Sequence, residues 1–355
     1  MDTQPVRFLH RGRIVEAGSA GITRSILDWL REDARCTGTK EGCNEGDCGA
    51  CTVVIGELDE RGALALQPAN ACIRFLPTLH GKALFTVEDL KSIAGGGLHP
   101  VQQAMVECHA SQCGFCTPGF VMSLWHTYER QLADGLASAL PTRQQLADEL
   151  SGNLCRCTGY RPILDAGQRM FDLPAARLDR EPVAAALAAI GAGKAFGYQP
   201  IAPAGPSSAS QAADGADRGH RFDAPRTLDQ LAALVERKPG ARLLAGCTDI
   251  GLWVNKQFRD VGDLIYLGNV TELKRIEVRD GYLCIGAGAS LEAAWAALDA
   301  GFDGLTDIWL RFASPPIRHA GTMGGNIANG SPIGDAAPVP RSKLPGPRWP
   351  PASKV

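Results

Sequence analysis

The first 85 residues alternate apolar and polar positions over short runs, which is the pattern of half-buried strands. Residues 6–9 and 13–16 alternate in this way on both sides of a short turn and predict a β-hairpin. Residues 25–31 are typical of a short amphipathic helix, and residues 51–55 of a β-branched strand. We therefore expect a small mixed sheet crossed by one helix in this region.

From about residue 100 the spacing of apolar positions changes from two to roughly 3.6, the period of an amphipathic helix. The pattern predicts helices at residues 101–110, 119–132, 142–150 and 163–171. The sequence then becomes rich in Ala, Gly, Ser and Pro between residues 182 and 219. Such a composition buries too little apolar surface to offset the entropy of ordering the chain, so we expect a linker there.

Regular patterning returns at residue 227. Residues 228–236 predict a helix, residues 242–246 a buried strand, and residues 247–251 the turn into a further helix. A turn between a strand and a helix presents bare backbone N–H groups, which suits a phosphate, although many such units bind nothing. A second Gly-rich run, residues 321–335, is dense in hydrogen-bonding side chains. Two such loops could together bind a pyrophosphate. The sequence contains no G-x-G-x-x-G motif, so the dinucleotide-binding fingerprint gives no support here.

The composition limits the kinds of partner and the cellular location that we expect. The 355 residues carry 36 Lys and Arg against 38 Asp and Glu, and no basic run occurs, so we expect neither nucleic acid nor a membrane surface as a partner. The N-terminus lacks a basic and apolar leader, and no apolar run approaches the roughly 18 residues of a membrane span. We therefore expect a soluble, cytoplasmic protein, in which 12 cysteines indicate metal binding rather than disulfides.

The strongest chemical signal is a glycine-threaded C-x4-C-x2-C loop formed by Cys43, Cys48 and Cys51. This spacing matches the plant-type iron–sulfur signature, whose fourth ligand lies farther along the chain, and Cys72 is the candidate. The glycines at 42, 46 and 49 are expected to supply the positive φ angles of a tight loop. The pattern favours one [2Fe–2S] cluster over the alternatives, a zinc site or buried structural cysteines.

A second set of cysteines lies at the starts of two predicted helices. Cys113 and Cys116 precede one helix, and Cys155 and Cys157 precede another. A helix N-terminus carries partial positive charge and free N–H groups, which suits thiolates and an anionic cluster. C-x2-C with C-x-C alone is equally compatible with zinc, but beside the first loop it favours a second [2Fe–2S] cluster.

Five segments together resemble a known family: GCNEGDCGACTV, SQCGFCTPG, GNLCRCTGYRP, LLAGCTDIG and TMGGNIANGSPIGD. From about residue 6 to residue 335 the chain resembles the iron–sulfur/flavin subunits of bacterial xanthine dehydrogenases, in the molybdenum hydroxylase family. The resemblance implies an α+β multidomain fold. Its parts are a ferredoxin-like β-grasp [2Fe–2S] domain at 1–85, an all-α four-helix [2Fe–2S] domain at 86–176, a linker at 177–221, the N-terminal part of an FAD-binding domain of the vanillyl-alcohol-oxidase (PCMH) type at 222–338, and a Pro-rich tail at 339–355.

The resemblance also implies cofactor contacts. It places at the FAD the residues Leu243, Leu244, Ala245, Gly246, Cys247, Thr248, Asp249, Ile250, Phe312, Thr322, Gly325, Asn326 and Asp335. It further suggests that Gln112 and Cys157 face the pterin cofactor of a partner subunit. The sequence departs from the family pattern in three places: Cys247 stands where Asn is frequent, Asp249 where Glu is common, and Pro315-Pro316 replaces a more flexible pair.

As function, the resemblance implies electron transfer. A molybdopterin-binding large subunit oxidises hypoxanthine or xanthine, and this chain passes the electrons through two [2Fe–2S] clusters to FAD and NAD. The same role in an aldehyde oxidase or another molybdenum hydroxylase is an alternative, and a non-enzymatic metal-binding interaction module is an alternative of another class. The family's FAD domain continues past the position of Asp335, while residues 336–355 hold six prolines. We therefore expect a truncated FAD domain with weakened flavin binding and little activity of the chain alone. A natural short form, with the remaining lobe on a separate chain, is the alternative.

Overall fold

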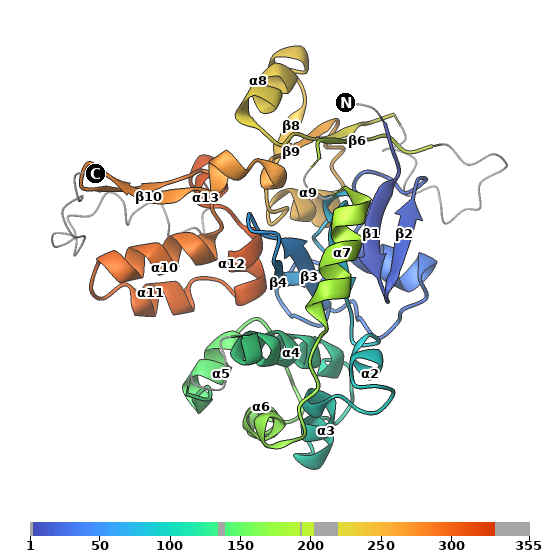
Figure 1. Ribbon diagram of the computed structural model, residues 1–355, viewed down its shortest axis with the longest axis vertical. Helices are drawn as coiled ribbons and strands as arrows, with labels where there is room; N and C mark the ends of the chain where they lie inside the picture. The colour runs from blue at the N-terminus through green and yellow to red at the C-terminus, as the bar shows by residue number, and fades with distance from the viewer. Residues whose placement is uncertain (1–2, 134–138, 192–193, 202–218, 331–355) are drawn as a thin grey trace.

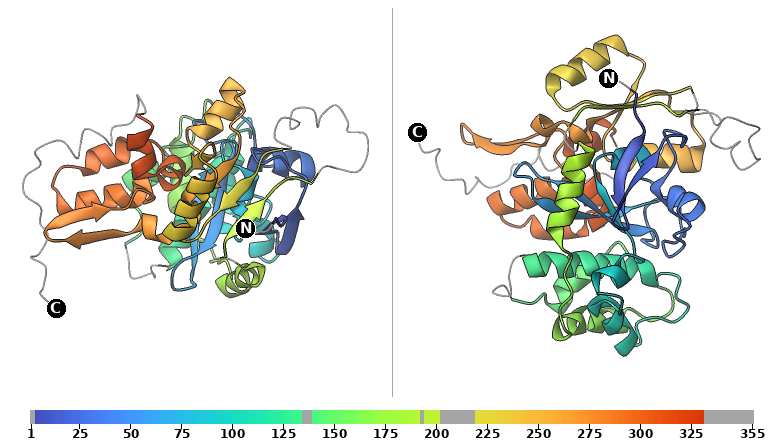
Figure 2. Two further views of the ribbon diagram at one scale, coloured as in Figure 1. Left: turned by 90° about the horizontal axis from the view of Figure 1, so that it is seen from above. Right: turned by 45° about the vertical axis from the view of Figure 1, so that its right-hand side comes forward.

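The computed structural model describes residues 3–133, 139–191, 194–201 and 219–330 (Figure 1). Asp335, the Pro-rich tail and residues 202–218 of the expected linker lie outside the described residues. The described chain forms a mixed α+β structure, as expected, with a set of helices gathered at one end (Figures 1 and 2). No helix in the described ranges is long and apolar enough to cross a membrane.

The N-terminal region is built on a five-stranded mixed sheet in the order β2-β1-β5-β3-β4. β1 pairs antiparallel with β2, which confirms the predicted hairpin, and parallel with β5. The strands are β1 Val6–His10, β2 Arg13–Ala17, β3 Thr52–Leu58, β4 Leu64–Asn70 and β5 Ala83–Phe85. The predicted crossing helix is α1 (Ile26–Asp28), continued by a π-helical turn at Trp29–Asp33, and a 3-10 turn follows β4 at Leu76–Leu79.

The four helices predicted after residue 100 are all confirmed. They are α3 Pro100–Glu107, α4 Thr117–Ala133, α5 Arg143–Glu149 and α6 Arg161–Arg169, preceded by the short α2 Leu90–Ile93 and followed by a 3-10 turn at Met170–Asp172. α4 is the central helix of the group, since Phe120, Trp125 and Tyr128 on it are each no more than 1% exposed. α4 also packs on β3, which joins the helices to the sheet.

The prediction of a linker at 177–221 is wrong for the first part of that range. α7 (Arg180–Ile190) lies there, followed by β6 (Phe196–Tyr198). α7 runs along the five-stranded sheet and contacts β1, β3 and β4 (Figure 1). Val183, Leu187 and Ile190 are buried on one face of α7, and this stripe of apolar side chains is enough to hold a helix that is otherwise mostly alanine.

The C-terminal region begins with a second sheet, in the order β6-β7-β9-β8, in which β7, β8 and β9 are parallel. Its remaining strands are β7 Phe222–Ala224, β8 Arg242–Leu244 and β9 Leu264–Tyr266. The predicted helices are confirmed as α8 (Leu228–Arg237) and α9 (Ile250–Gln257). The strand expected to be buried at 242–246 is buried only in part, because Leu243 is 48% exposed while Leu244 is fully buried.

A hairpin and four helices complete this region. The hairpin is β10 Ile276–Arg279 with β11 Tyr282–Ile285, and the helices are α10 Leu291–Gly301, α11 Thr306–Arg311, α12 Pro315–Ala320 and α13 Met323–Ala328. Short 3-10 turns at Leu267–Asn269 and Thr271–Lys274 precede the hairpin. α12 packs on β4 of the first sheet, so the C-terminal region is in direct contact with the N-terminal one.

Candidate metal and cofactor sites

The first cysteine site comprises Cys43, Cys48, Cys51 and Cys72. The Sγ atoms of Cys51 and Cys72 lie 3.3 Å apart, and both side chains are buried. Cys43 Sγ accepts hydrogen bonds from the amides of Asp47 at 3.4 Å and Cys48 at 3.3 Å. Hydrogen bonds from the Cys48 and Cys72 thiols hold the pKa of Cys43 far below its usual range. The loop therefore gathers all four sulfurs. It favours negative charge on Cys43, whereas hydrogen bonding to Cys43 and burial raise the pKa of Cys48 and Cys72.

The glycines of this loop serve two different purposes. Gly46 and Gly49 have φ angles of 82° and 69°, as expected of a tight loop. Gly42 was expected to have a positive φ and does not. A Cβ on Gly42 would instead lie 2.7 Å from Cys48 Sγ, so the glycine there leaves room for the sulfur. Among the other residues of the loop, Asn44 has a φ of 55°, a conformation that asparagine tolerates.

The second cysteine site comprises Cys113, Cys116, Cys155 and Cys157. The Sγ atoms of Cys113 and Cys157 lie 3.7 Å apart on an exposed part of the surface, whereas Cys155 is buried. Burial opposes ionisation of Cys155, but the hydroxyl and amide of Thr158 and the amide of Cys157 outweigh it and lower the pKa of that thiol to about 7. α4 begins directly after Cys116, as predicted.

The sulfur separations fit a binuclear cluster. Two thiolates on one tetrahedral metal with metal–sulfur bonds of about 2.3 Å lie about 3.7 Å apart. The close pair in the second site, at 3.7 Å, has this spacing, and the pair in the first site, at 3.3 Å, is somewhat closer. In the described ranges no group of three or more His, Cys, Asp or Glu side chains could hold a single metal ion. A [2Fe–2S] cluster does not require three protein ligands on one metal ion, because each of its two irons takes two thiolates.

The two cysteine sites are joined by backbone contacts. The amide of Leu154, next to Cys155, donates to the carbonyl of Cys48 at 3.0 Å. The buried side chain of Asn153 donates to the carbonyl of Gly49 at 3.1 Å and accepts from Ser123 at 2.7 Å. These contacts fix the first site against the helices that carry the second.

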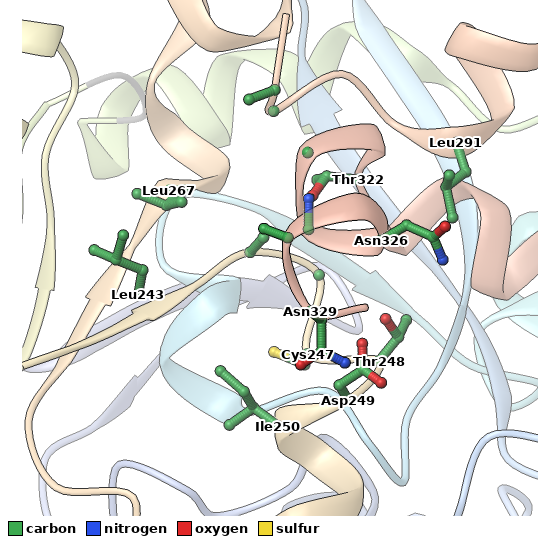
Figure 3. A pocket seen from close by; sticks show the side chains of 18 of the residues that line it. Leu243, Cys247, Thr248, Asp249, Ile250, Leu267, Leu291, Thr322, Asn326 and Asn329 are labelled. Atoms are coloured by element: carbon green, nitrogen blue, oxygen red, sulfur yellow. The ribbon is translucent and has the colours of Figure 1, made fainter. Parts of the chain in front are cut away.

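A cavity of about 440 Å³ lies in the C-terminal region (Figure 3). We call it the glycine-lined cavity. Of the residues expected at a flavin, it is lined by Leu243, Ala245, Gly246, Cys247, Thr248, Asp249, Ile250, Thr322, Gly325 and Asn326. The two Gly-rich loops predicted to face each other therefore do so. A Cβ on Gly246 would lie 1.8 Å from the carbonyl oxygen of Ala320, so only glycine permits this approach.

The polar groups of the cavity fit a dinucleotide. Within the described residues the amides of Thr248, Asp249 and Ile250, at the start of α9, have no hydrogen-bond acceptor. Free amides at a helix start are donors for a phosphate. The buried side-chain oxygen of Asn326 also lacks a partner. Burial raises the pKa of Asp249, which stands at the same turn. The cavity thus offers unused donors and acceptors to a ligand.

Two of the residues expected at the flavin do not line the cavity, and a third is not described. Leu244 is buried in the sheet, and Asp335 lies outside the described residues. Phe312 is 7% exposed and packs against Trp295, with ring centroids 5.8 Å apart, in the core between α10 and α11. Gln112, expected at the partner's pterin, is exposed beside Cys113.

Sequence reasoning missed part of the lining. The cavity is also bounded by Arg242, Trp253, Leu267, Leu273, Ala287, Gly288 and Leu291, which were not expected there. Its remaining lining, Gly321, Gly324, Ala328 and Asn329, belongs to the second Gly-rich run, as expected. The short run Gly286-Ala287-Gly288 was a usable signal, but it does not match the dinucleotide fingerprint. A Cβ on Gly324 would lie 2.6 Å from Ala287 Cβ, so this run packs directly on the second Gly-rich loop.

Comparison with known proteins adds to this geometry. A family described as a [2Fe–2S] binding domain matches residues 86–168, and one described as an FAD binding domain in molybdopterin dehydrogenase matches residues 219–340. Xanthine dehydrogenase of Drosophila pseudoobscura pseudoobscura is 31% identical over 373 residues, covering 95% of this chain and 27% of that protein. Aldehyde oxidase 1 of Cavia porcellus is 44% identical over 169 residues, covering 47% of this chain and 12% of that protein.

A solved structure, quinoline 2-oxidoreductase from Pseudomonas putida 86, is 32% identical and covers 53% of this chain and 98% of that one, with a TM-score of 0.37. The chain spans about a quarter of the length of the xanthine dehydrogenases that it matches. The matched domains have [2Fe–2S] clusters and FAD as their cofactors, and the cysteine sites and the cavity fit those groups. The chain belongs to the molybdenum hydroxylase family and carries iron–sulfur and FAD-binding domains of that family.

Proposed function

We propose that this chain is the electron-transfer subunit of a xanthine dehydrogenase. In this role it carries electrons from a molybdopterin-binding partner, which oxidises hypoxanthine or xanthine, to FAD and then to NAD. The similarity to xanthine dehydrogenases along 95% of the chain supports this assignment over the rest of the family.

The cofactors are assigned as follows. Cys43, Cys48, Cys51 and Cys72 would hold one [2Fe–2S] cluster, within a ferredoxin-like β-grasp domain at 1–85. Cys113, Cys116, Cys155 and Cys157 would hold the other, within the helical domain at 86–176. The glycine-lined cavity would hold FAD, in a domain of the vanillyl-alcohol-oxidase type at 222–338. The clusters supply one-electron carriers and FAD supplies a two-electron acceptor.

The order of the three sites carries the proposal. The first cysteine site touches the second through the hydrogen bond from Leu154 to Cys48. On its other side it touches the helix of the glycine-lined cavity, since a Cβ on Gly251 of α9 would lie 2.5 Å from the carbonyl oxygen of Ile73, next to Cys72. The first site therefore contacts both of the other sites, which supports a chain of electron carriers in this order.

The surface near the second cysteine site suits a partner subunit. Phe115, Leu154 and Tyr160 are 47%, 44% and 40% exposed. Exposed aromatic side chains beside a cofactor site are typical of protein–protein interfaces. We propose that the molybdopterin-binding subunit covers this surface, with Gln112 and Cys157 facing its pterin.

Aldehyde oxidation is the second candidate. It is favoured by the 44% identity to an aldehyde oxidase over 47% of the chain, a higher identity than that of the xanthine dehydrogenase match. Substrate choice would then lie with the partner, and the geometry of this chain would be the same.

Purification of the native complex tests the function. We expect a molybdopterin-binding chain to co-purify, and the complex to oxidise xanthine with reduction of NAD. Oxidation of aldehydes but not purines would favour the second candidate. A colourless protein that contains zinc and no flavin would instead identify a non-enzymatic metal-binding module. Xanthine oxidation by the purified chain without a second polypeptide would contradict the assignment of electron transfer to this chain.

A further inference from the structure

One short helix links the cavity to the first cysteine site. α9 begins at the turn of Cys247, Thr248 and Asp249, which line the cavity (Figure 3). Eight residues later the helix ends at Gln257. Its last turn carries two polar side chains that reach the first cysteine site, 183 or more residues away in sequence.

Asn255 is the first of the two. Its side-chain amide donates to the carbonyl of Cys72 at 2.8 Å, and to the side-chain and backbone oxygens of Asn44 at 3.1 and 3.3 Å. It therefore ties the isolated fourth cysteine to the loop that carries the other three. This contact is neutral, so its role is to hold the two segments at a fixed separation.

Lys256 is the second, and it brings a charge. Its Nζ donates to the carbonyl of Cys43 at 2.6 Å, and Glu45 lies 3.6 Å from it. The lysine side chain is 42% exposed, so water screens its charge in part. Glu45 also lies on the loop and neutralises some of that charge. The remaining positive potential acts on the sulfur ligands from the side that faces α9.

We propose that Lys256 is a positioning residue of the first cysteine site that raises the reduction potential of the [2Fe–2S] cluster bound there. The proposal rests on the cluster assignment made above. Reduction adds one electron and no proton to the cluster, so the reduced form is more negative by one charge. A nearby cation stabilises that form. Net charge, hydrogen bonds and solvent exposure are the features that set the potential of such clusters.

The consequence concerns the direction of electron flow. An electron that moves between the two sites is lost by the second cluster and gained by the first. A cation next to the first cluster favours this transfer, because it stabilises the product. Lys256 belongs to α9, which begins at the cavity. The helix that lines the cavity would therefore also make the first cluster the better electron acceptor.

The test is a redox titration of the full chain, loaded with iron and sulfide, with the two clusters followed separately by electron paramagnetic resonance. Lys256→Gln and Lys256→Met remove the charge, the former keeping a donor and the latter none. Lys256→Arg keeps the charge. Arg279→Gln, on the β10–β11 hairpin, is the control for loss of one positive charge elsewhere.

We expect both neutral variants to lower the equilibrium constant for reduction of the first cluster roughly tenfold, or about 59 mV for one electron, and to leave the second cluster unchanged. Lys256→Arg and Arg279→Gln should match the wild type. An unchanged first cluster, equal shifts of both clusters, or an arginine variant that behaves like the neutral ones would overturn the proposal. So would failure of both neutral variants to hold the first cluster, because Lys256 would then be a structural residue.

The titration needs no partner, purine or NAD. A chain that binds no clusters would therefore defeat the proposed function, whereas a chain with two clusters and no shift would defeat only the role of Lys256.

Discussion

The first and second cysteine sites hold the same number of sulfurs in opposite surroundings. In the first, Cys51 and Cys72 are buried, and the loop is enclosed by the sheet, the helical region and α9. In the second, Cys113 and Cys157 are exposed. In the first site Cys43 and Cys48 are partly exposed, so the second site is the more open to water of the two.

The difference teaches which site faces inward and which outward. A site whose ligands are mostly covered by the chain is suited to exchange electrons with groups of the same chain. A site with exposed ligands can exchange them with another molecule that docks against it. The enclosure of the first site depends on close backbone approaches, so it should be sensitive to small substitutions that the second tolerates.

The largest expected effect is loss of one cluster without the other. Cys48→Ser removes a thiolate from the first site, and we expect about half the iron and one of the two electron paramagnetic resonance signals to remain, because the second site has its own four sulfurs. Iron analysis and spectra of the reduced protein measure this.

Cys108→Ser is the matched control for this substitution. Cys108 lies outside both cysteine sites, so the variant should keep all iron and both signals. If the Cys48 variant also retained them, the ligand assignment of the first site would be wrong.

The next effect compares one glycine from each site. Gly49 has a φ of 69°, and a Cβ there would lie 2.1 Å from the carbonyl oxygen of Gly152. Gly114 has a φ of 82° and open space around it. We expect Gly49→Ala to lower the free energy of unfolding by about 3 kcal/mol or more, and Gly114→Ala by about 1 kcal/mol. Urea unfolding of both variants tests this, and equal losses would contradict the tighter enclosure of the first site.

The smallest effect concerns how the helical region is held. His126 on α4 is 5% exposed and contacts His319 of α12, with ring centroids 6.0 Å apart. Burial, and then the charges of His319 and Arg130, lower the pKa of His126 to about 3. The unfolded chain therefore takes up this proton first, and stability falls as the pH drops from about 6.5 towards 3. At pH 5 the loss from His126 is about 2 kcal/mol.

His126→Phe should remove the contribution of His126 to the pH dependence of the unfolding free energy. We expect the difference in unfolding free energy between pH 7 and pH 5 to shrink by about 2 kcal/mol relative to the wild type. His109→Asn, at an exposed position whose φ of 52° suits asparagine, serves as the control and should leave the difference unchanged. A variant that kept the full wild-type dependence would exclude His126 as its source.

Local patterns predicted the local elements. The hairpin of β1 and β2 and the helices α3 to α6 follow from alternation and from the 3.6-residue period, because neighbouring residues decide both. α7 was missed because composition was averaged over residues 182–219, which hid an apolar side chain at every third or fourth position: Val183, Leu187 and Ile190. A short amphipathic stripe within an alanine-rich run was the available signal.

The residues of a candidate site could be predicted only where their spacing is visible within one segment of the sequence. The cysteine spacings indicated which sulfurs gather, and the structure brings close pairs together in both sites. The contacts of Asn255 and Lys256 with the first site could not be predicted, because they join segments 183 or more residues apart. The role of Phe312 was inferred from resemblance alone and stays a prediction, and in the described structure its ring packs in the core.

The contact of Gly49 with Gly152 also limits how this protein can be recombined. Gly119 belongs to the same junction, since a Cβ on it would lie 2.2 Å from the carbonyl oxygen of Gly49. The three glycines come from three separate segments. Gly119 leaves room for the backbone of Gly49, Gly49 for that of Gly152, and Gly152 for the side chains of Ser314 and Pro316. A chimera that combines the N-terminal sheet of one relative with the helices of another must inherit all three together, so these domains are expected to be exchanged as a pair.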